Sequence, residues 1–146
     1  MTRRSGTYPS PASFKEAPVF RAHVRALGLG LPCDDRIEPA DRSPLGRPLA
    51  TRWGRLRNRF AVQPMEGWDG TEDGRPTELT RRRWVNFGLS GAKLIWGGEA
   101  VAVHHDGRAN PNQLLMRPEN LAELESLRRT LIETHAREFG DIDDLL

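Results

Sequence analysis

The chain has 146 residues, enough for one compact domain, and 29% of them are charged, with a formal net charge of only +2. This balance gives no general attraction to nucleic acid or to an anionic membrane, and no nucleic-acid recognition motif accompanies the arginine runs at 52–59 and 81–83, which are interpreted as solvated faces. The single cysteine, Cys33, excludes an internal disulfide, and the absence of a signal-peptide pattern or a membrane-length apolar run favours a cytoplasmic protein.

The first third of the chain is expected to be an irregular extension, residues 1–47. Residues 1–15 have the Ser, Pro, Gly and Arg content of a disordered tail. An amphipathic pattern predicts a short helix over residues 18–29, and the charged, proline-rich residues 34–47 predict an extended connector. We therefore expect the ordered domain to span residues 48–146.

The domain begins with a predicted strand, loop and helix. Residues 58–63 form an apolar run that Pro64 closes, and residues 67–76 are a loop dense in Gly and Asp. Thr77 is the expected N-cap of a helix over residues 78–90, with Gly91 just past its end. A second short apolar run, residues 92–98, predicts another strand, and a long loop follows it.

The last predicted helix has the clearest boundaries. Asn120 is the expected cap, with Glu123 three residues later, and Gly140 is the expected stop. His135 lies in the apolar stripe, where a partly buried residue is expected rather than a metal ligand. The stripe consists of Leu121, Leu124, Leu127, Leu131, Ile132, His135 and Phe139.

Alternating strands and helices predict an α/β protein with a parallel sheet. The loops after the strands are long and the returns after the helices are short, as in a (β/α)8 barrel. A doubly wound sheet shares part of this pattern, so periodicity alone leaves both folds open. Two strands cannot close a barrel or bury both faces of a parallel sheet.

The two strand ends carry the residues suited to binding. After the first strand, Pro64 releases the chain from the sheet, and Met65 offers a polarizable surface for a flat ring, although a methionine in the core explains the same pattern. After the second strand, Gly97 and Gly98 allow a close backbone approach. No metal site is expected, because the adjacent His104 and His105 do not aim at one ion and no further ligand has useful spacing.

Four segments together resemble the N-terminal part of the Old Yellow Enzyme family. They are NRFAVQPM at 58–65, DGRPTEL at 73–79, SGAKLIWGGEAVAV at 90–103 and DGRANPNQL at 106–114. The family consists of NADH:flavin oxidoreductases built on an FMN-binding TIM barrel. The resemblance covers residues 43–140 and implies the first two βα units of a partial (β/α)8 barrel, preceded by the irregular extension.

The resemblance also implies roles for six residues. Gln63, Pro64, Met65 and Glu66 would lie along one face of the FMN ring, and Ala100 would be the small residue against it. Trp68 would line the substrate pocket. The family commonly has Thr or Cys in place of Glu66. An ionised carboxylate there would oppose negative charge on reduced flavin and lower its potential, and the alternatives are a protonated carboxyl or a side chain turned away to bind substrate.

The function implied is an FMN-dependent oxidoreductase that uses NADH or NADPH to reduce a small-molecule substrate with an electron-poor alkene. The catalytic residues and the phosphate-binding loops would lie beyond Leu146, so we expect an N-terminal fragment that needs the missing C-terminal barrel half and is inactive alone. The alternative is a non-catalytic half-barrel or interaction module whose helix face docks to a partner chain. The sequence leaves open a homo-oligomer.

Overall fold

The computed structural model describes residues 8–146. The chain forms two units, and the boundary between them in the sequence falls between Pro39 and Ala40. The first unit contains a 3-10 turn, η1 (Pro11–Ser13), and one helix, α1 (Ala17–Ala26), so the helix expected over residues 18–29 is confirmed in a shorter form. Part of the expected tail, residues 1–7, lies outside the described residues. The domain boundary expected near Pro48 stays a prediction.

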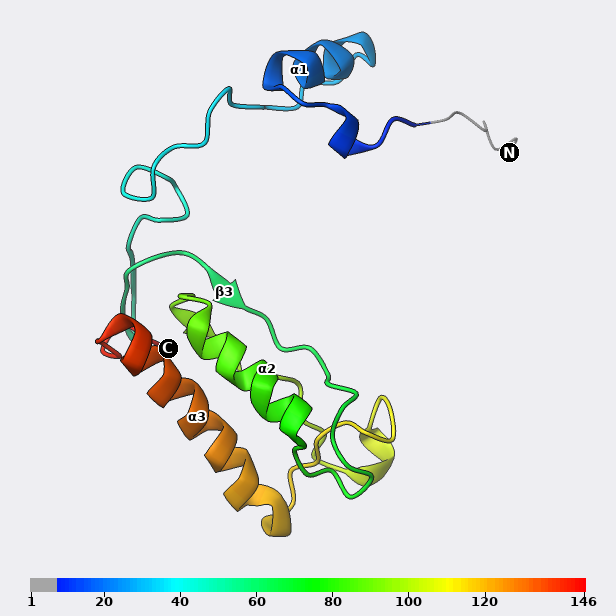
Figure 1. The fold of residues 1–146 in the computed structure, drawn as a ribbon, viewed down its shortest axis with the longest axis vertical. Coiled ribbons are helices and arrows are strands. Elements are labelled where there is room, and N and C mark those ends of the chain that lie inside the picture. The colour runs from blue at the N-terminus through cyan, green and yellow to red at the C-terminus, as the bar shows by residue number, and fades with distance from the viewer. Residues whose placement is uncertain (1–7) are drawn as a thin grey trace. The chain divides into compact units, whose positions relative to one another are not determined.

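The second unit has mixed α/β architecture (Figure 1). Residues 8–146 contain three α-helices and two sheets of two strands each, and they form no barrel. In chain order the second unit's elements are β1 (Leu49–Thr51), β2 (Gly54–Leu56), β3 (Ala61–Val62), α2 (Glu78–Leu89), β4 (Leu94–Ile95), η2 (His105–Gly107), η3 (Pro118–Asn120) and α3 (Leu121–Phe139).

The parallel pairing expected from the order of elements is present. β3 pairs with β4 in parallel, with Ala61 opposite Leu94 and Val62 opposite Ile95, and α2 connects the two strands. Both strands are much shorter than the apolar runs at 58–63 and 92–98. On the other side of β4, the Leu146 N–H donates to the Lys93 carbonyl at 2.9 Å and the Leu146 carbonyl accepts from the Ile95 N–H at 2.7 Å. This bonding pattern is that of a parallel neighbour.

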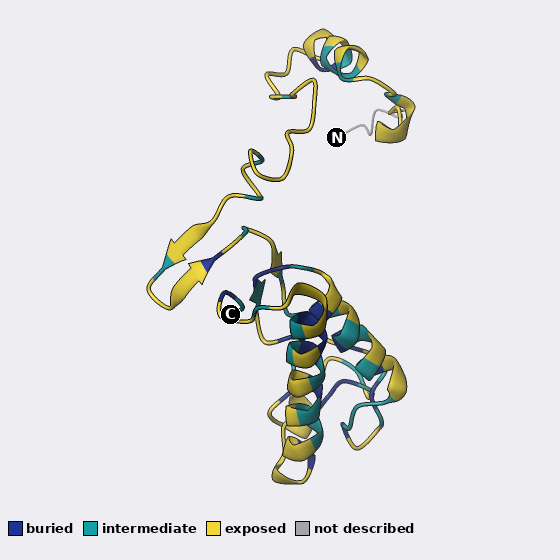
Figure 2. Cartoon of the chain, turned by 60° about the vertical axis from the view of Figure 1, so that its left-hand side comes forward, coloured by how far each residue is buried: buried dark blue, intermediate teal, exposed yellow. Residues whose placement is uncertain are grey.

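The antiparallel hairpin of β1 and β2 is absent from the sequence-based prediction. Its two-residue loop is Arg52-Trp53, which lacks the Asn-Gly type of signal that identifies a hairpin in a sequence. Thr51 stabilises the turn instead, because its hydroxyl donates to the Gly54 carbonyl and accepts from the Trp53 N–H. Leu56 is buried, whereas most other hairpin residues are exposed (Figure 2).

The core lies where α2 and α3 run side by side. Its buried members are Trp84 on α2 and Leu127 and Leu131 on α3, together with Leu114 from the loop between β4 and α3. The helices approach closely at Gly88, where an added Cβ would lie 2.6 Å from the Leu131 carbonyl oxygen. A glycine is therefore required at this position for steric reasons.

The predicted helix ends agree with the structure at all four positions. The Thr77 side chain caps α2 in a capping box with Thr80, Gly91 follows the helix with a positive φ, and Gly140 ends α3 in the left-handed conformation. Asn120 occupies the N-cap position of α3, as predicted, but its side chain has another role. The Asn120 side chain makes no capping bond but donates to the carbonyls of residues 73, 74 and 115, which fixes the preceding loops.

Several buried polar side chains connect the start of β4 to the two helices. The Nδ1 of His135 contacts the Gly88 carbonyl at 3.0 Å, so Nδ1 must donate, and Nε2 then accepts from the Lys93 ammonium at 2.9 Å. Lys93 also pairs with Asp144 at 2.8 Å. Burial, and next the Lys93 charge, lower the pKa of His135. His135 is thus a fully buried hydrogen-bonding residue rather than a partly buried stripe residue.

Within the described residues, no helix combines the length and the apolar character needed to cross a membrane.

The contact at Gly88 predicts that Gly88→Ala lowers the free energy of unfolding by about 1–3 kcal/mol, because the added methyl group forces the helices apart. Helix propensity alone would favour alanine by about 1 kcal/mol, so the sign of the change separates the two effects. Urea denaturation measures it. Asn86→Ala, at an exposed position of the same helix, is the control, and a Gly88→Ala protein as stable as the wild type would contradict the close packing.

The lowered pKa of His135 predicts a loss of stability at mildly acidic pH. As the pH falls below about 6.5, the unfolded chain binds a proton at this residue before the folded protein does. The free energy of unfolding therefore decreases as the pH falls from 7 to 5, and His135→Asn flattens this slope. His105→Asn, at an exposed histidine, is the control. Equal slopes for His135→Asn and the wild type would contradict the assignment.

Candidate functional site

The ends of β3 and β4 meet at one edge of the sheet. The Trp96 N–H donates to the Val62 carbonyl at 3.0 Å, and the Ala100 N–H donates to the Met65 carbonyl at 3.2 Å. Pairing thus continues past the strands themselves, as far as the residues that the sequence singles out. The structure brings Met65 and Ala100 together across this edge, and the Met65 carbonyl is occupied by this hydrogen bond.

The side chains at this edge are open to solvent. Met65 is 70% exposed and Trp68 is 71% exposed, while Gln63 and Glu66 are also exposed and Pro64 and Ala100 are half-buried. The alternative that Met65 is a core residue is therefore wrong. Met65 and Trp68 therefore each leave most of their apolar side chain in contact with solvent.

The turn after β4 is shaped by the core rather than by an open site. Gly97 and Gly98 have φ values of 70° and 68°, which favour glycine. An added Cβ at Gly98 would collide with the Trp84 indole. The close backbone approach predicted for this pair is thus present at Gly98 alone, and its partner is the side chain of Trp84.

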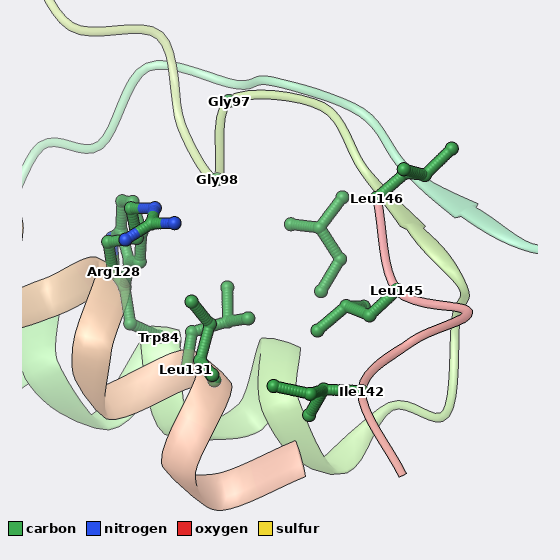
Figure 3. A pocket seen from close by; sticks show the side chains of 10 residues that line it. Trp84, Gly97, Gly98, Arg128, Leu131, Ile142, Leu145 and Leu146 are labelled. Atoms are coloured by element: carbon green, nitrogen blue, oxygen red, sulfur yellow. The ribbon is translucent and has the colours of Figure 1, made fainter. Parts of the chain in front are cut away.

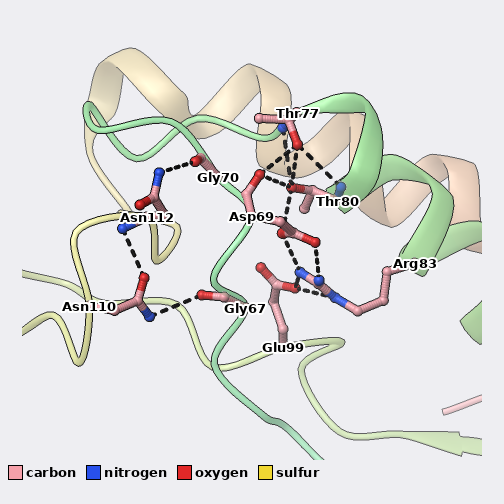
Figure 4. A network of polar contacts seen from close by, with 9 residues as sticks. All are labelled: Gly67, Asp69, Gly70, Thr77, Thr80, Arg83, Glu99, Asn110 and Asn112. Carbon is pink, nitrogen blue, oxygen red and sulfur yellow. Dashed lines mark hydrogen bonds and ion pairs between the residues drawn. The ribbon is translucent and has the colours of Figure 1, made fainter.

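Three charged side chains join the loops that follow β3 and β4 (Figure 4). Arg83, on α2, donates through Nη2 to Asp69 Oδ1 at 3.0 Å and through Nε to Glu99 Oε2 at 3.0 Å, and Nη1 also pairs with Asp69. The side chain of Glu99 is 1% exposed, that of Asp69 21% and that of Arg83 29%. We refer to Arg83, Asp69 and Glu99 as the ion triad.

The pKa of Glu99, the buried member of the ion triad, is raised. Burial raises the pKa of Glu99, the hydrogen bond and charge of Arg83 oppose this rise, and the nearby Asp69 charge adds to it. Thr80 donates to Asp69 Oδ1 at 3.0 Å, and the hydroxyl of Thr77 donates to the Asp69 carbonyl. The triad is therefore anchored at the first turn of α2.

Two asparagines attach a third loop to the same place. Asn110 donates to the Gly67 carbonyl at 3.2 Å, and Asn112 donates to the Gly70 carbonyl at 2.8 Å, while the Gly70 N–H donates back to the Asn112 carbonyl. Gln113 donates to the Ala100 carbonyl at 2.9 Å. The loop after β4 thus folds back over both strand ends and fixes their backbone.

The sequence-based prediction misses the ion triad. It interprets the run 81–83 as a solvated face, whereas only Arg82 of the three is exposed. A signal was available, because Asp69 and Glu99 each follow one of two strands predicted to be parallel neighbours. Two carboxylates at adjacent strand ends require a cation between them, and Arg83 lies on the connecting helix.

The histidine-rich loop brings one histidine and one carboxylate together. His104 and Asp106 contact each other on the surface, and both are about four-fifths exposed. Across residues 8–146, no three His, Cys, Asp or Glu side chains are grouped in a way that could hold an ion.

An apolar cavity of about 420 Å³ lies beside β4, and Gly97 and Gly98 of the turn after this strand also line it. Trp84, Leu131 and Ile95 line it, and Figure 3 shows Ile142 and Leu145 of the C-terminal segment facing Leu131 across it. Leu146 contributes to this cavity and also to a second one, of about 380 Å³, between β4 and the hairpin. Both faces of the small sheet are therefore only partly covered.

Neither a scan against protein-family models nor a search of curated proteins returns a match for this chain. A function for it rests on the residues and contacts described above.

The exposure of Trp68 predicts that this residue contributes little to folding. Trp68→Ala should change the free energy of unfolding by no more than about 0.5 kcal/mol. Trp84→Ala, the buried counterpart, should lower it by about 3–5 kcal/mol. Chemical denaturation followed by circular dichroism measures both changes. A large loss of stability in Trp68→Ala would place that side chain in the core and remove it from a binding surface.

Proposed function

We propose that this chain forms the first two strand–helix units of an FMN-binding (β/α)8 barrel in a flavin oxidoreductase of the Old Yellow Enzyme type. The observation that carries the proposal is the hydrogen bond between Ala100 and Met65 at the common end of two parallel strands. It places the two segments that the resemblance assigns to the flavin at one edge. Active sites of this fold lie at the carboxyl ends of the strands.

The residues at this edge fit a flat ring. The exposed Met65 side chain offers a polarizable contact, and Ala100 keeps the opposite strand end free of bulk. Trp68, also exposed, would line the pocket for the substrate. When bound, FMN would supply the chemistry, accepting hydride from NADH or NADPH and delivering it to an electron-poor alkene such as an α,β-unsaturated carbonyl.

Glu66 is the residue that departs from the resemblance. Its side chain is exposed and makes no hydrogen bond or ion pair with residues 8–146. In the proposed site it would lie near the N5/O4 edge of the ring, where a negative charge disfavours the accumulation of negative charge on the flavin. We therefore assign Glu66 the role of lowering the flavin potential.

The edge of the sheet supports the proposal that a further barrel half completes the structure. Leu146 already occupies the position of a third parallel strand beside β4. Strands that extended this pairing would cover the apolar cavity lined by Trp84, Leu131 and Leu145. The basic and Gly-rich loops expected to hold the FMN phosphate would come from that half.

A second candidate is a non-catalytic module that uses the same open cavity to bind a partner chain. The helix face first considered for this role is not free, because Leu127 and Leu131 are buried against α2. The open cavity beside β4 is the observation that favours this candidate. It differs from the flavin proposal in requiring no FMN.

The test is to express the protein from its complete native reading frame and measure bound flavin. We expect flavin absorbance, oxidation of NADH or NADPH with an unsaturated carbonyl compound, and an FMN dissociation constant at least about tenfold higher in Met65→Asp, which places charge against the ring. Met116→Asp, at another exposed methionine, is the control. A protein that carries no flavin and binds no added FMN would refute the proposal and favour the partner-binding module.

A further inference from the structure

We propose that Arg83 is a positioning residue that sets the spacing between the two strand-end loops, and with it the placement of Trp68 relative to Ala100. Asp69 directly follows Trp68, and Glu99 directly precedes Ala100. Arg83 bonds both carboxylates, so one guanidinium joins the two segments that would contact the flavin and substrate. The spacing itself is independent of the proposed function, and only its use in holding FMN rests on that function.

The geometry requires a guanidinium at this position. Asp69 accepts hydrogen bonds from Nη1 and Nη2 of Arg83, and Glu99 Oε2 accepts hydrogen bonds from Nε and Nη2. A planar group with donors on several sides can span two carboxylates in this way. A lysine ammonium carries the same charge at a single point and cannot hold both partners at these positions.

The backbone of the first loop is shaped around the guanidinium. Gly67 is buried, and an added Cβ there would collide with Nη2 of Arg83. The Gly67 carbonyl accepts from Asn110 on the opposite side. The loop between Met65 and Asp69 therefore passes directly over Arg83, and its path depends on the position of that side chain.

The reference point of this arrangement is α2. Arg83 lies on the same helix as Thr80, which donates to Asp69 Oδ1, so the first loop has two attachments to one rigid element. The second loop has Glu99, whose side chain is almost completely buried. Movement of either loop would break a bond to α2, and movement of the second loop would leave the buried Glu99 carboxylate without its cation.

A purely charge-neutralising role gives a different expectation. If Arg83 only compensated the carboxylates, Arg83→Lys would restore the wild-type properties, because the charge is kept. If Arg83 positions the loops, Arg83→Lys retains the fold but loosens the residues that the guanidinium joins. The conservative variant therefore separates the two roles.

The experiment measures amide hydrogen exchange in the full chain, together with FMN affinity in the protein from the complete reading frame. In Arg83→Lys we expect exchange at least about tenfold faster in residues 66–70 and 98–101 only. The FMN dissociation constant should rise by about tenfold or more. Arg82→Lys, at the exposed neighbour on the same helix, should match the wild type in both measurements.

Wild-type exchange in both loops of Arg83→Lys would overturn the proposal, as would wild-type FMN affinity in a protein that binds FMN. If the wild type binds no FMN, the proposed function fails while the exchange measurement still decides the role of Arg83. If the Arg83→Lys protein does not fold, Asp69→Asn is tested instead, because this change weakens only the ion pair between the first loop and Arg83. Faster exchange confined to residues 66–70 then supports the proposal, and unchanged exchange there overturns it.

Discussion

The close contact between α2 and α3 at Gly88 is the constraint on which the rest of the second unit depends. It buries Trp84 and Leu131, and it brings His135 to the Gly88 carbonyl and to the Lys93 ammonium. Lys93 immediately precedes β4, so the same contact fixes where β4 begins relative to the helices. A two-residue parallel strand has few hydrogen bonds of its own, and its position is determined by the elements that pack around it.

Charged and amide side chains hold the backbone in place at the strand ends. In a larger sheet, the pairing of long strands has this role. Arg83 joins the loops after β3 and β4, and Asn110 and Asn112 attach the following loop to the first. Buried charges of this kind contribute little net stability, because their desolvation offsets their attraction. Their effect is on geometry. They hold the backbone in place while Met65 and Trp68 stay exposed.

This combination of a fixed backbone and exposed apolar side chains is what a binding surface for a flat ligand requires. The neighbouring cavity beside β4 is different in kind, since it is lined by core residues such as Trp84 and Leu131 and is bordered by Leu146, which bonds to the strand edge. In the proposed function, the first surface would hold the cofactor and the second would be covered by further protein. A barrel completed beyond β4 accounts for both, which is why the flavin proposal explains more of the structure than a partner-binding module does.

The sequence by itself determined the features that local interactions control. The cap at Thr77 and the stop at Gly140 depend on side-chain chemistry and backbone freedom within one turn of the helix, and the order of strands and helices determined the parallel pairing. Only the tertiary structure decided the roles of Asn120, Arg83 and His135. Each has its partners on residues far away in the chain, so its local pattern indicated a cap, a solvated face and an apolar stripe. Strand length was decided in the same way, because pairing depends on the neighbouring strand and not on the apolar run alone.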